Sequence, residues 1–129
     1  MDTGTAAAEA AIAWVAEYER VWREDDLDAL AALFTPDARY LRSPYATPLE
    51  GLAAIREHWS DDTPFTMTAE PVAVSGRDAV VRVEVSYGGD RPQEYRDLWV
   101  LRFAPDGRAE LFEDWAYWPD KPYNTDGDR

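Results

Sequence analysis

Two neighbouring acidic residues near the end of the chain are the first candidates for chemistry. Glu113 and Asp114 lie inside the aromatic stretch "LFEDWAYWP", Leu111 to Pro119, which has the composition of a β-strand. Because successive side chains of a strand point to opposite faces, only one of the two carboxyl groups can face an apolar interior. Polarity alone does not say which acid that is, since both faces of the stretch carry aromatic residues.

Another acidic residue, Asp97, lies in the preceding stretch "EYRDLWVLRF". One face of this stretch carries Arg96 and Arg102, which suit contact with solvent. We therefore expect Asp97 to face the interior, in a set that also holds Tyr95, Trp99, Leu101 and Phe103. Two carboxyl groups in one apolar cavity would raise the pKa of one of them and fit it for proton transfer near neutral pH.

The elements that carry these acids form a run with a period of two. The stretches are "FTMTAEPVAVS", "DAVVRVEVSYG", "EYRDLWVLRF" and "RAELFEDWAYW", separated by "GR", "GDRPQ" and "PDG". Successive strands with such short turns predict an antiparallel meander. In the second stretch three valines oppose Arg82 and Glu84, so we expect these two charged residues to point outward as an ion pair.

Helical periodicity precedes the strands. One stripe of residues 6–24 carries Ala11, Val15, Tyr18 and Trp22. Asp26 can N-cap a second helix, "LDALAALF", which Pro36 stops, and "GLAAIREHWS" predicts a third. Between them, "ARYLRS" is typical of a short strand and "PYATPLEG" of a loop. Three helices followed by a long antiparallel sheet predict an α+β fold, with the helices packed on one face of the sheet.

Composition excludes several functional classes. The chain has 129 residues, enough for one domain spanning 1–129, whose residues 120–129 form a polar tail. A net charge of −13 argues against nucleic acid or an anionic membrane as a partner.

With no cysteine and one histidine, His58, the sequence predicts neither disulfides nor a metal centre, and we expect His58 to be a rim or surface residue. The Ala-rich start resembles neither a signal peptide nor a membrane span, so we expect a soluble cytoplasmic protein.

Three segments resemble the nuclear-transport-factor-2-like superfamily, which includes ketosteroid isomerases, limonene-epoxide hydrolases and SnoaL-like polyketide cyclases. The segments are "YERVWREDDLDALAALFTPDARY", "GLAAIREHW" and "LRFAPDGRAELFEDW". The order and spacing of these segments carry the resemblance, which covers nearly the whole chain. It implies a cone-shaped α+β roll, in which a curved, mainly antiparallel sheet wraps three N-terminal helices around a pocket.

The resemblance also implies roles for individual residues. Counted from Gly107, Asp114 matches an active-site aspartate of the epoxide hydrolases, which makes it the acid expected in the pocket. Tyr18 has the spacing of the oxyanion-hole tyrosine of the isomerases, and Tyr40 matches a water-positioning tyrosine of the hydrolases. Trp59 matches a pocket tyrosine. The expected pocket wall also includes Trp22, Trp99 and Phe112.

Two departures from the family patterns limit what can be carried over. Arg42 stands where the isomerases have their general-base aspartate, and arginine cannot abstract a proton at ordinary pH. We expect Arg42 instead to hold an anionic group of the substrate or to form a buried ion pair with one of the aspartates. Trp99 stands in the position of the second oxyanion donor of the isomerases, where its indole N–H could still donate.

Two functional hypotheses remain open at this point. The first is a cofactor-independent acid–base enzyme, an isomerase, cyclase, dehydratase or hydrolase, acting on a small apolar oxygenated molecule. Asp114 or Asp97 would carry the proton, while Tyr18 and Tyr40 donate hydrogen bonds. The second is a non-catalytic ligand-binding or dimerisation module with structural acids. On either hypothesis the outer sheet face predicts a homodimer through an apolar surface that includes Leu98, Val100, Trp115 and Tyr117.

Overall fold

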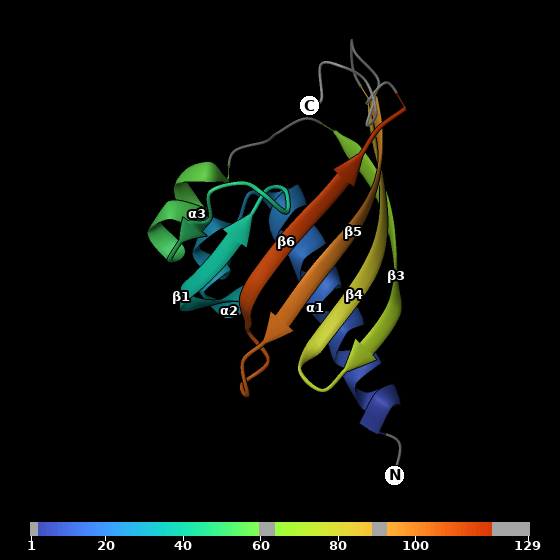
Figure 1. Cartoon of the computed structure of the whole chain (residues 1–129). Helices are drawn as coiled ribbons and strands as arrows, with labels where there is room; N and C mark the ends of the chain where they lie inside the picture. The colour runs from blue at the N-terminus through green and yellow to red at the C-terminus, as the bar shows by residue number, and fades with distance from the viewer. Residues whose placement is uncertain (1–2, 60–63, 89–92, 120–129) are drawn as a thin grey trace.

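The computed structural model describes residues 3–59, 64–88 and 93–119, and it is an α+β structure. Figure 1 shows a curved, open sheet with the helices gathered on one side of it. The strands follow the order β2-β1-β6-β5-β4-β3. The α+β prediction with three helices on a curved, mainly antiparallel sheet is confirmed.

The first helix, α1, runs from Thr3 to Glu24. Its predicted stripe faces the sheet and is largely buried, because each of its members contributes to the core or packs against it. A short 3₁₀ turn, η1 (Leu27–Ala29), leads into α2 (Leu30–Leu33). Asp26 occupies the N-cap position but makes no capping hydrogen bond; its carboxylate accepts one from Arg20 at 3.1 Å. The expected cap is therefore replaced by an ion pair.

The end of the second helix was predicted too late. The chain is already extended at Phe34, the first residue of β1 (Phe34–Leu41), so Pro36 lies inside a strand. The pairing of β1 with β6 shifts register between Phe34 and Arg39. Proline is tolerated in strands at such irregularities, because its missing N–H is not needed for a regular ladder.

The segment predicted as a loop contains a short strand, β2 (Leu49–Glu50). It pairs antiparallel with Arg39 and Tyr40 of β1. The third helix, α3 (Leu52–His58), follows directly and buries Ile55. Gly51 at the N-cap has φ +88°, a conformation that favours glycine.

The remaining strands form the predicted antiparallel meander. They are β3 (Phe65–Ser75), β4 (Asp78–Tyr87), β5 (Gln93–Phe103) and β6 (Ala109–Tyr117). The sheet is mixed because β1 adds to β6 in parallel. This pairing joins the N-terminal part of the chain to its last strand and closes the helices against the sheet.

The alternation of side chains on β4 and β5 agrees with the sequence pattern. The inner face buries Val81, Val83, Val85, Asp97, Trp99 and Leu101. Arg82 and Glu84 are exposed on the outer face, as expected, but they do not pair with each other. Arg82 pairs at 2.6 Å with Glu70, which lies directly opposite it on β3. Directly opposite residues on adjacent strands are closer than residues two apart on one strand, which explains the choice of partner.

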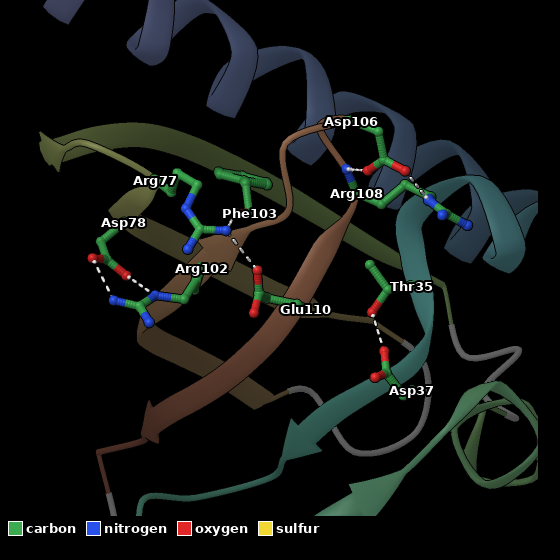
Figure 2. A network of polar contacts seen from close by, with 9 residues as sticks. All are labelled: Thr35, Asp37, Arg77, Asp78, Arg102, Phe103, Asp106, Arg108 and Glu110. Carbon is green, nitrogen blue, oxygen red and sulfur yellow. Dashed lines mark hydrogen bonds and ion pairs between the residues drawn. The ribbon is translucent and has the colours of Figure 1, made fainter.

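The β3–β4 and β5–β6 turns lie at the same end of the sheet, and charged residues there form ion pairs with one another (Figure 2). Arg77 pairs with Glu110 and Arg102 with Asp78, each at 3.0 Å. All four side chains are substantially exposed, so each pair contributes little to stability. These charges belong to the surface of the fold.

No helix in the described part of the chain is long and apolar enough to cross a membrane.

Candidate functional site

A cavity of about 370 Å³ lies between the helices and the inner face of the sheet. It opens at the end of the sheet where β4 ends and β5 begins, which is the end away from the charged residues of Figure 2. Helical residues supply one wall: Tyr18 and Trp22 from α1, and His58 and Trp59 at the end of α3. The helical stripe of α1 that builds the core thus also supplies part of the cavity.

The sheet supplies the opposite wall. Strands β4 and β5 contribute Val85, Tyr87, Tyr95, Asp97 and Trp99, while β1 and β6 contribute Tyr40, Asp114 and Ala116. The two aspartates selected from the sequence, Asp97 and Asp114, therefore open onto the same cavity as the two selected tyrosines, Tyr18 and Tyr40. Glu113 points to the other face of β6, where it accepts a hydrogen bond from Trp115 Nε1 at 2.9 Å.

The two tyrosines form a hydrogen-bonded pair. Tyr18 Oη and Tyr40 Oη are 3.1 Å apart, and either can be the donor. Burial raises the pKa of both phenols, which keeps them neutral and able to donate. Phe112 does not line the cavity. It lies behind the tyrosines, with ring centroids 4.7 Å from Tyr40 and 5.5 Å from Tyr18, and supports them through stacking.

The two aspartates form a carboxyl pair. Asp114 lies opposite Trp99, and Asp97 lies opposite Ala116, so the acids are diagonal neighbours on the same face of adjacent strands. Asp97 is only 7% exposed. Burial is the main cause that raises the pKa of Asp97. For Asp114, burial followed by the charge of Asp97 raises the pKa to about 9.

The electrostatics of the pair point to one shared proton. Asp97 Oδ1 and Asp114 Oδ1 are buried and accept no hydrogen bond from a donor in the described part of the chain. The two carboxyl groups are near enough for a protonated Asp114 to donate to Asp97, which raises the pKa of Asp114 and opposes the rise for Asp97. With its pKa raised to about 9, Asp114 is a protonated member of this pair at neutral pH, as one acid is in coupled carboxyl dyads.

Trp99 completes the polar centre of the cavity. Its ring is 2% exposed, and Nε1 is buried without a hydrogen bond to a described residue. The indole N–H lies close enough to both carboxyl groups to act on them, and it lowers the pKa of each. It is an uncommitted donor next to the two acids.

The structure corrects the expectation for Arg42. Its side chain is exposed and does not line the cavity, because β1 ends at Leu41 and the chain turns away. No ion pair joins it to Asp97 or Asp114, both of which lie in the described part of the chain. Arg42 acts on the site only at a distance, through its charge on Tyr40 and His58. The buried ion pair with an aspartate is therefore not formed, and Arg42 is not part of the cavity wall.

Sequence reasoning did not select five residues that line the cavity: His58, Val85, Tyr87, Tyr95 and Ala116. His58 lies at the rim, as expected, but its ring also packs against Tyr40 at 5.6 Å between centroids. Burial, followed by the charge of Arg42, lowers the pKa of His58, so it is neutral near pH 7. Tyr87 and Tyr95 pack edge to face at 5.7 Å on β4 and β5. The alternation of side chains along the two strands already assigned both tyrosines to the inner face. The pairing of the strands puts them in the same cavity wall as the acids.

Within the described residues no group of three or more His, Cys, Asp or Glu side chains is placed to hold a metal ion. The two aspartates are the only acidic groups in the wall of this cavity among those residues. The polar groups of the wall are thus carboxyl, phenol, indole and imidazole groups.

The comparison with protein families decides the affiliation. The model of the SnoaL-like domain matches residues 15–111. The chain belongs to the SnoaL-like domain family. The match begins at Val15 on α1 and reaches Leu111 on β6, so it includes most of the elements that build the cavity.

Two solved structures show the same nuclear-transport-factor-2-like fold. The first is SalBIII, an epoxide hydrolase/cyclase-like enzyme of pyran ring formation in the polyether salinomycin. It is 22% identical with a TM-score of 0.68, over 83% of this chain and 88% of that one. The second is Rv0760c from Mycobacterium tuberculosis, in complex with estradiol-17β-hemisuccinate. It is 16% identical with a TM-score of 0.67, over 82% of this chain and 92% of that one.

No curated protein matches the sequence. At these identities the structural neighbours establish only the fold of this SnoaL-like domain, because one fold can host many chemistries.

Proposed function

We propose that this SnoaL-like domain binds a small, largely apolar oxygenated molecule and transfers protons to or from it without a cofactor. The observation that carries the proposal is the common cavity of the Asp97–Asp114 pair and the Tyr18–Tyr40 pair. The first pair can accept and release a proton, and the second can donate hydrogen bonds to an oxygen. Aromatic walls around both pairs suit an apolar ligand body.

The division of work within the carboxyl pair follows from charge. With a pKa raised to about 9, Asp114 is the neutral member and a general acid near neutral pH. The carboxylate of Asp97 is the general base. A neutral phenol of Tyr18 or Tyr40 can stabilise charge that develops on the oxygen of the substrate, as can the uncommitted Trp99 N–H.

This arrangement supports isomerisation, cyclisation, dehydration or hydrolysis, all of which need a proton donor and a proton acceptor. The position that is a general-base aspartate in ketosteroid isomerases is Arg42 here, and Arg42 lies outside the cavity. The base would therefore have to come from the strands β5 and β6. SalBIII, as an epoxide hydrolase/cyclase-like enzyme of the same fold, makes ring-forming or ring-opening chemistry a reasonable class to test first.

The second candidate is a non-catalytic ligand-binding module. The complex of Rv0760c with estradiol-17β-hemisuccinate supports it, because that protein of the same fold holds a bound small molecule. On this hypothesis the aspartates serve the structure of the cavity wall and orient the ligand.

Activity measurements on a panel of enones and epoxides separate the two candidates. If the domain is an enzyme, Asp114→Asn should lower the rate of conversion by about 100-fold or more. Glu113→Gln removes the neighbouring acid on the other face of the same strand and should leave the rate unchanged. Equal rates in the wild type and Asp114→Asn, or no conversion in either, would reject the acid–base role and favour the binding module.

We also propose that the outer face of the sheet joins two copies of the chain. Leu98 and Trp115 lie directly opposite each other there, 38% and 36% exposed, and Tyr117 is 49% exposed. Val100 is partly buried beside them. Apolar side chains that adjoin on one face favour a two-fold contact, because the same patch on a second copy can cover them.

A further inference from the structure

The wall of the cavity carries two acidic side chains but no lysine or arginine among the described residues. Asp97 and Asp114 are its acidic groups, and the other titratable side chains that line it are the phenols of four tyrosines and the imidazole of His58. Arg42, the basic residue expected there, is exposed outside the cavity. The chain as a whole has a net charge of −13. A negatively charged ligand group would therefore meet repulsion and no counter-charge.

Aromatic rings surround the two acids. Besides Tyr40, six tyrosine and tryptophan residues line the cavity, some from the helical wall and some from the sheet: Tyr18, Trp22, Trp59, Tyr87, Tyr95 and Trp99. The ring of Tyr18 packs against those of Trp59 and Trp99 at 4.7 and 4.6 Å between centroids. Aromatic faces attract cations, most strongly where water is excluded. Rings combined with carboxylates are the chemistry that proteins use to hold an ammonium group.

A separate observation concerns unused acceptor atoms. Asp97 is almost completely buried, with only 7% of its surface exposed. Its Oδ1 atom, like Oδ1 of Asp114, accepts no hydrogen bond from a described residue, although both side chains line the cavity. A buried carboxylate oxygen without a donor is costly. A ligand that brings N–H donors and a positive charge would relieve both atoms at once.

We propose that the ligand of this cavity carries a protonated amine on an apolar or aromatic body, with the ammonium group between Asp97 and Asp114. The inference rests on the second candidate function, the ligand-binding module in the same cavity, and it names the class of its ligand, because an ammonium group between the acids would ionise the general acid of the first candidate. The rings of the two walls hold the apolar body. A carboxylate in place of the amine is rejected, because it would face the two acids.

Binding of such a ligand has a consequence for the shared proton. An ammonium group between the two acids favours the ionised form of both carboxyl groups. Since the empty pair holds one proton near neutral pH, the amine should displace it into solvent. A neutral ligand of the same shape has no reason to do so. Proton release therefore reports where the ammonium group binds, independently of affinity.

Calorimetric titration with three matched probes tests the proposal: 2-(1-naphthyl)ethylamine, 2-(1-naphthyl)ethanol and 1-naphthylacetate, at pH 7 in phosphate and in HEPES. We expect the amine to bind at least about tenfold more tightly than the alcohol, and the acetate at least about tenfold more weakly than the alcohol. The difference between the two buffers should give release of about one proton per amine bound and none for the alcohol.

Two variants assign the effect to the acids. In the double variant Asp97→Asn with Asp114→Asn, the preference for the amine over the alcohol should fall below about threefold and proton release should vanish. Glu113→Gln also removes an acid from β6 but leaves the cavity unchanged, so both effects should persist. Circular dichroism of each variant checks that the fold is retained.

Each remaining outcome overturns the proposal. If the alcohol binds as tightly as the amine, the amine class is wrong while the acid–base function on a neutral molecule still stands. If the amine does not bind, or binds without proton release, the ammonium group is not held by the pair. Conversion of enones or epoxides that depends on Asp114 would in that case still support the proposed function.

Discussion

Asp97 and Asp114 are diagonal neighbours on the inner face of adjacent strands, with Asp114 opposite Trp99 and Asp97 opposite Ala116. This register puts two carboxyl groups on one wall of an aromatic cavity. Desolvation alone would raise the pKa of each, and proximity makes the pair hold one proton. The consequences for stability can be measured without knowing the substrate.

The stability of the protein should carry a pH dependence that comes from Asp114. In the unfolded chain an aspartate titrates near pH 4, whereas the folded structure raises the pKa of Asp114 to about 9. Between these values the folded state binds the proton more tightly than the unfolded state. The contribution of this group to the free energy of unfolding is therefore full below about pH 4 and is lost as the pH rises toward 9.

Asp114→Asn should remove that dependence, because the amide keeps the shape of the side chain and cannot ionise. At pH 8 we expect the variant to be more stable than the wild type by about 2 kcal/mol. Urea unfolding of both proteins at pH 5 and pH 8 measures the effect, and Glu113→Gln controls for the loss of one negative charge. An identical change between the two pH values in wild type and Asp114→Asn would show that Asp114 ionises normally.

The hydrogen bond between Tyr18 and Tyr40 should couple the two hydroxyl groups energetically. Both are buried, so Tyr18→Phe or Tyr40→Phe leaves the remaining hydroxyl without this partner. Each single variant should lose about 1–2 kcal/mol of unfolding free energy. The double variant should lose less than the sum of the two, because it leaves no orphaned hydroxyl. Denaturant unfolding in a double-mutant cycle measures this, and strict additivity would contradict the pairing.

The outer face of the sheet should mediate self-association. Leu98→Glu with Trp115→Glu places like charges across the proposed two-fold contact and should raise the dissociation constant by about 100-fold or more. Sedimentation velocity at micromolar concentration measures the assembly state of the wild type and of this variant. Arg82→Glu, also on the outer face but in the strand pair β3–β4, tests whether charge alone has this effect. A wild type that sediments as a monomer would reject the contact.

Local patterns were sufficient to assign the two faces of β4 and β5. Asp97 could be assigned to the interior because Arg96 and Arg102 alternate with apolar residues along one strand. The same alternation did not distinguish Asp114 from Glu113, since both faces of β6 carry aromatic residues. Only the family resemblance selected Asp114, and the structure indeed opens it onto the cavity.

One local pattern and one inference from the family resemblance were misleading. Pro36 appeared to stop a helix, whereas the pairing of β1 with β6 draws Phe34 and the residues after it into a strand. Arg42 appeared to belong to the pocket because its position in the sequence matches a catalytic position of related enzymes. Its side chain is exposed because β1 ends one residue earlier. Neither the pairing partner nor the length of a strand can be inferred from the residues that are its neighbours in the sequence.

The sequence by itself determined the long helix α1, the meander from β3 to β6 and the alternation of buried residues along β4 and β5, because these follow from the local geometry of the backbone. It also determined the chemical inventory: acids, phenols and indoles, with no cysteine and a single histidine. Tertiary structure decided which of these groups meet. The register of β5 against β6 brings Asp97 beside Asp114, and the placement of α1 on the inner side of the sheet brings Tyr18 to Tyr40 of β1. These contacts join residues far apart in the chain, and their geometry depends on strand pairing and side-chain packing across the whole domain.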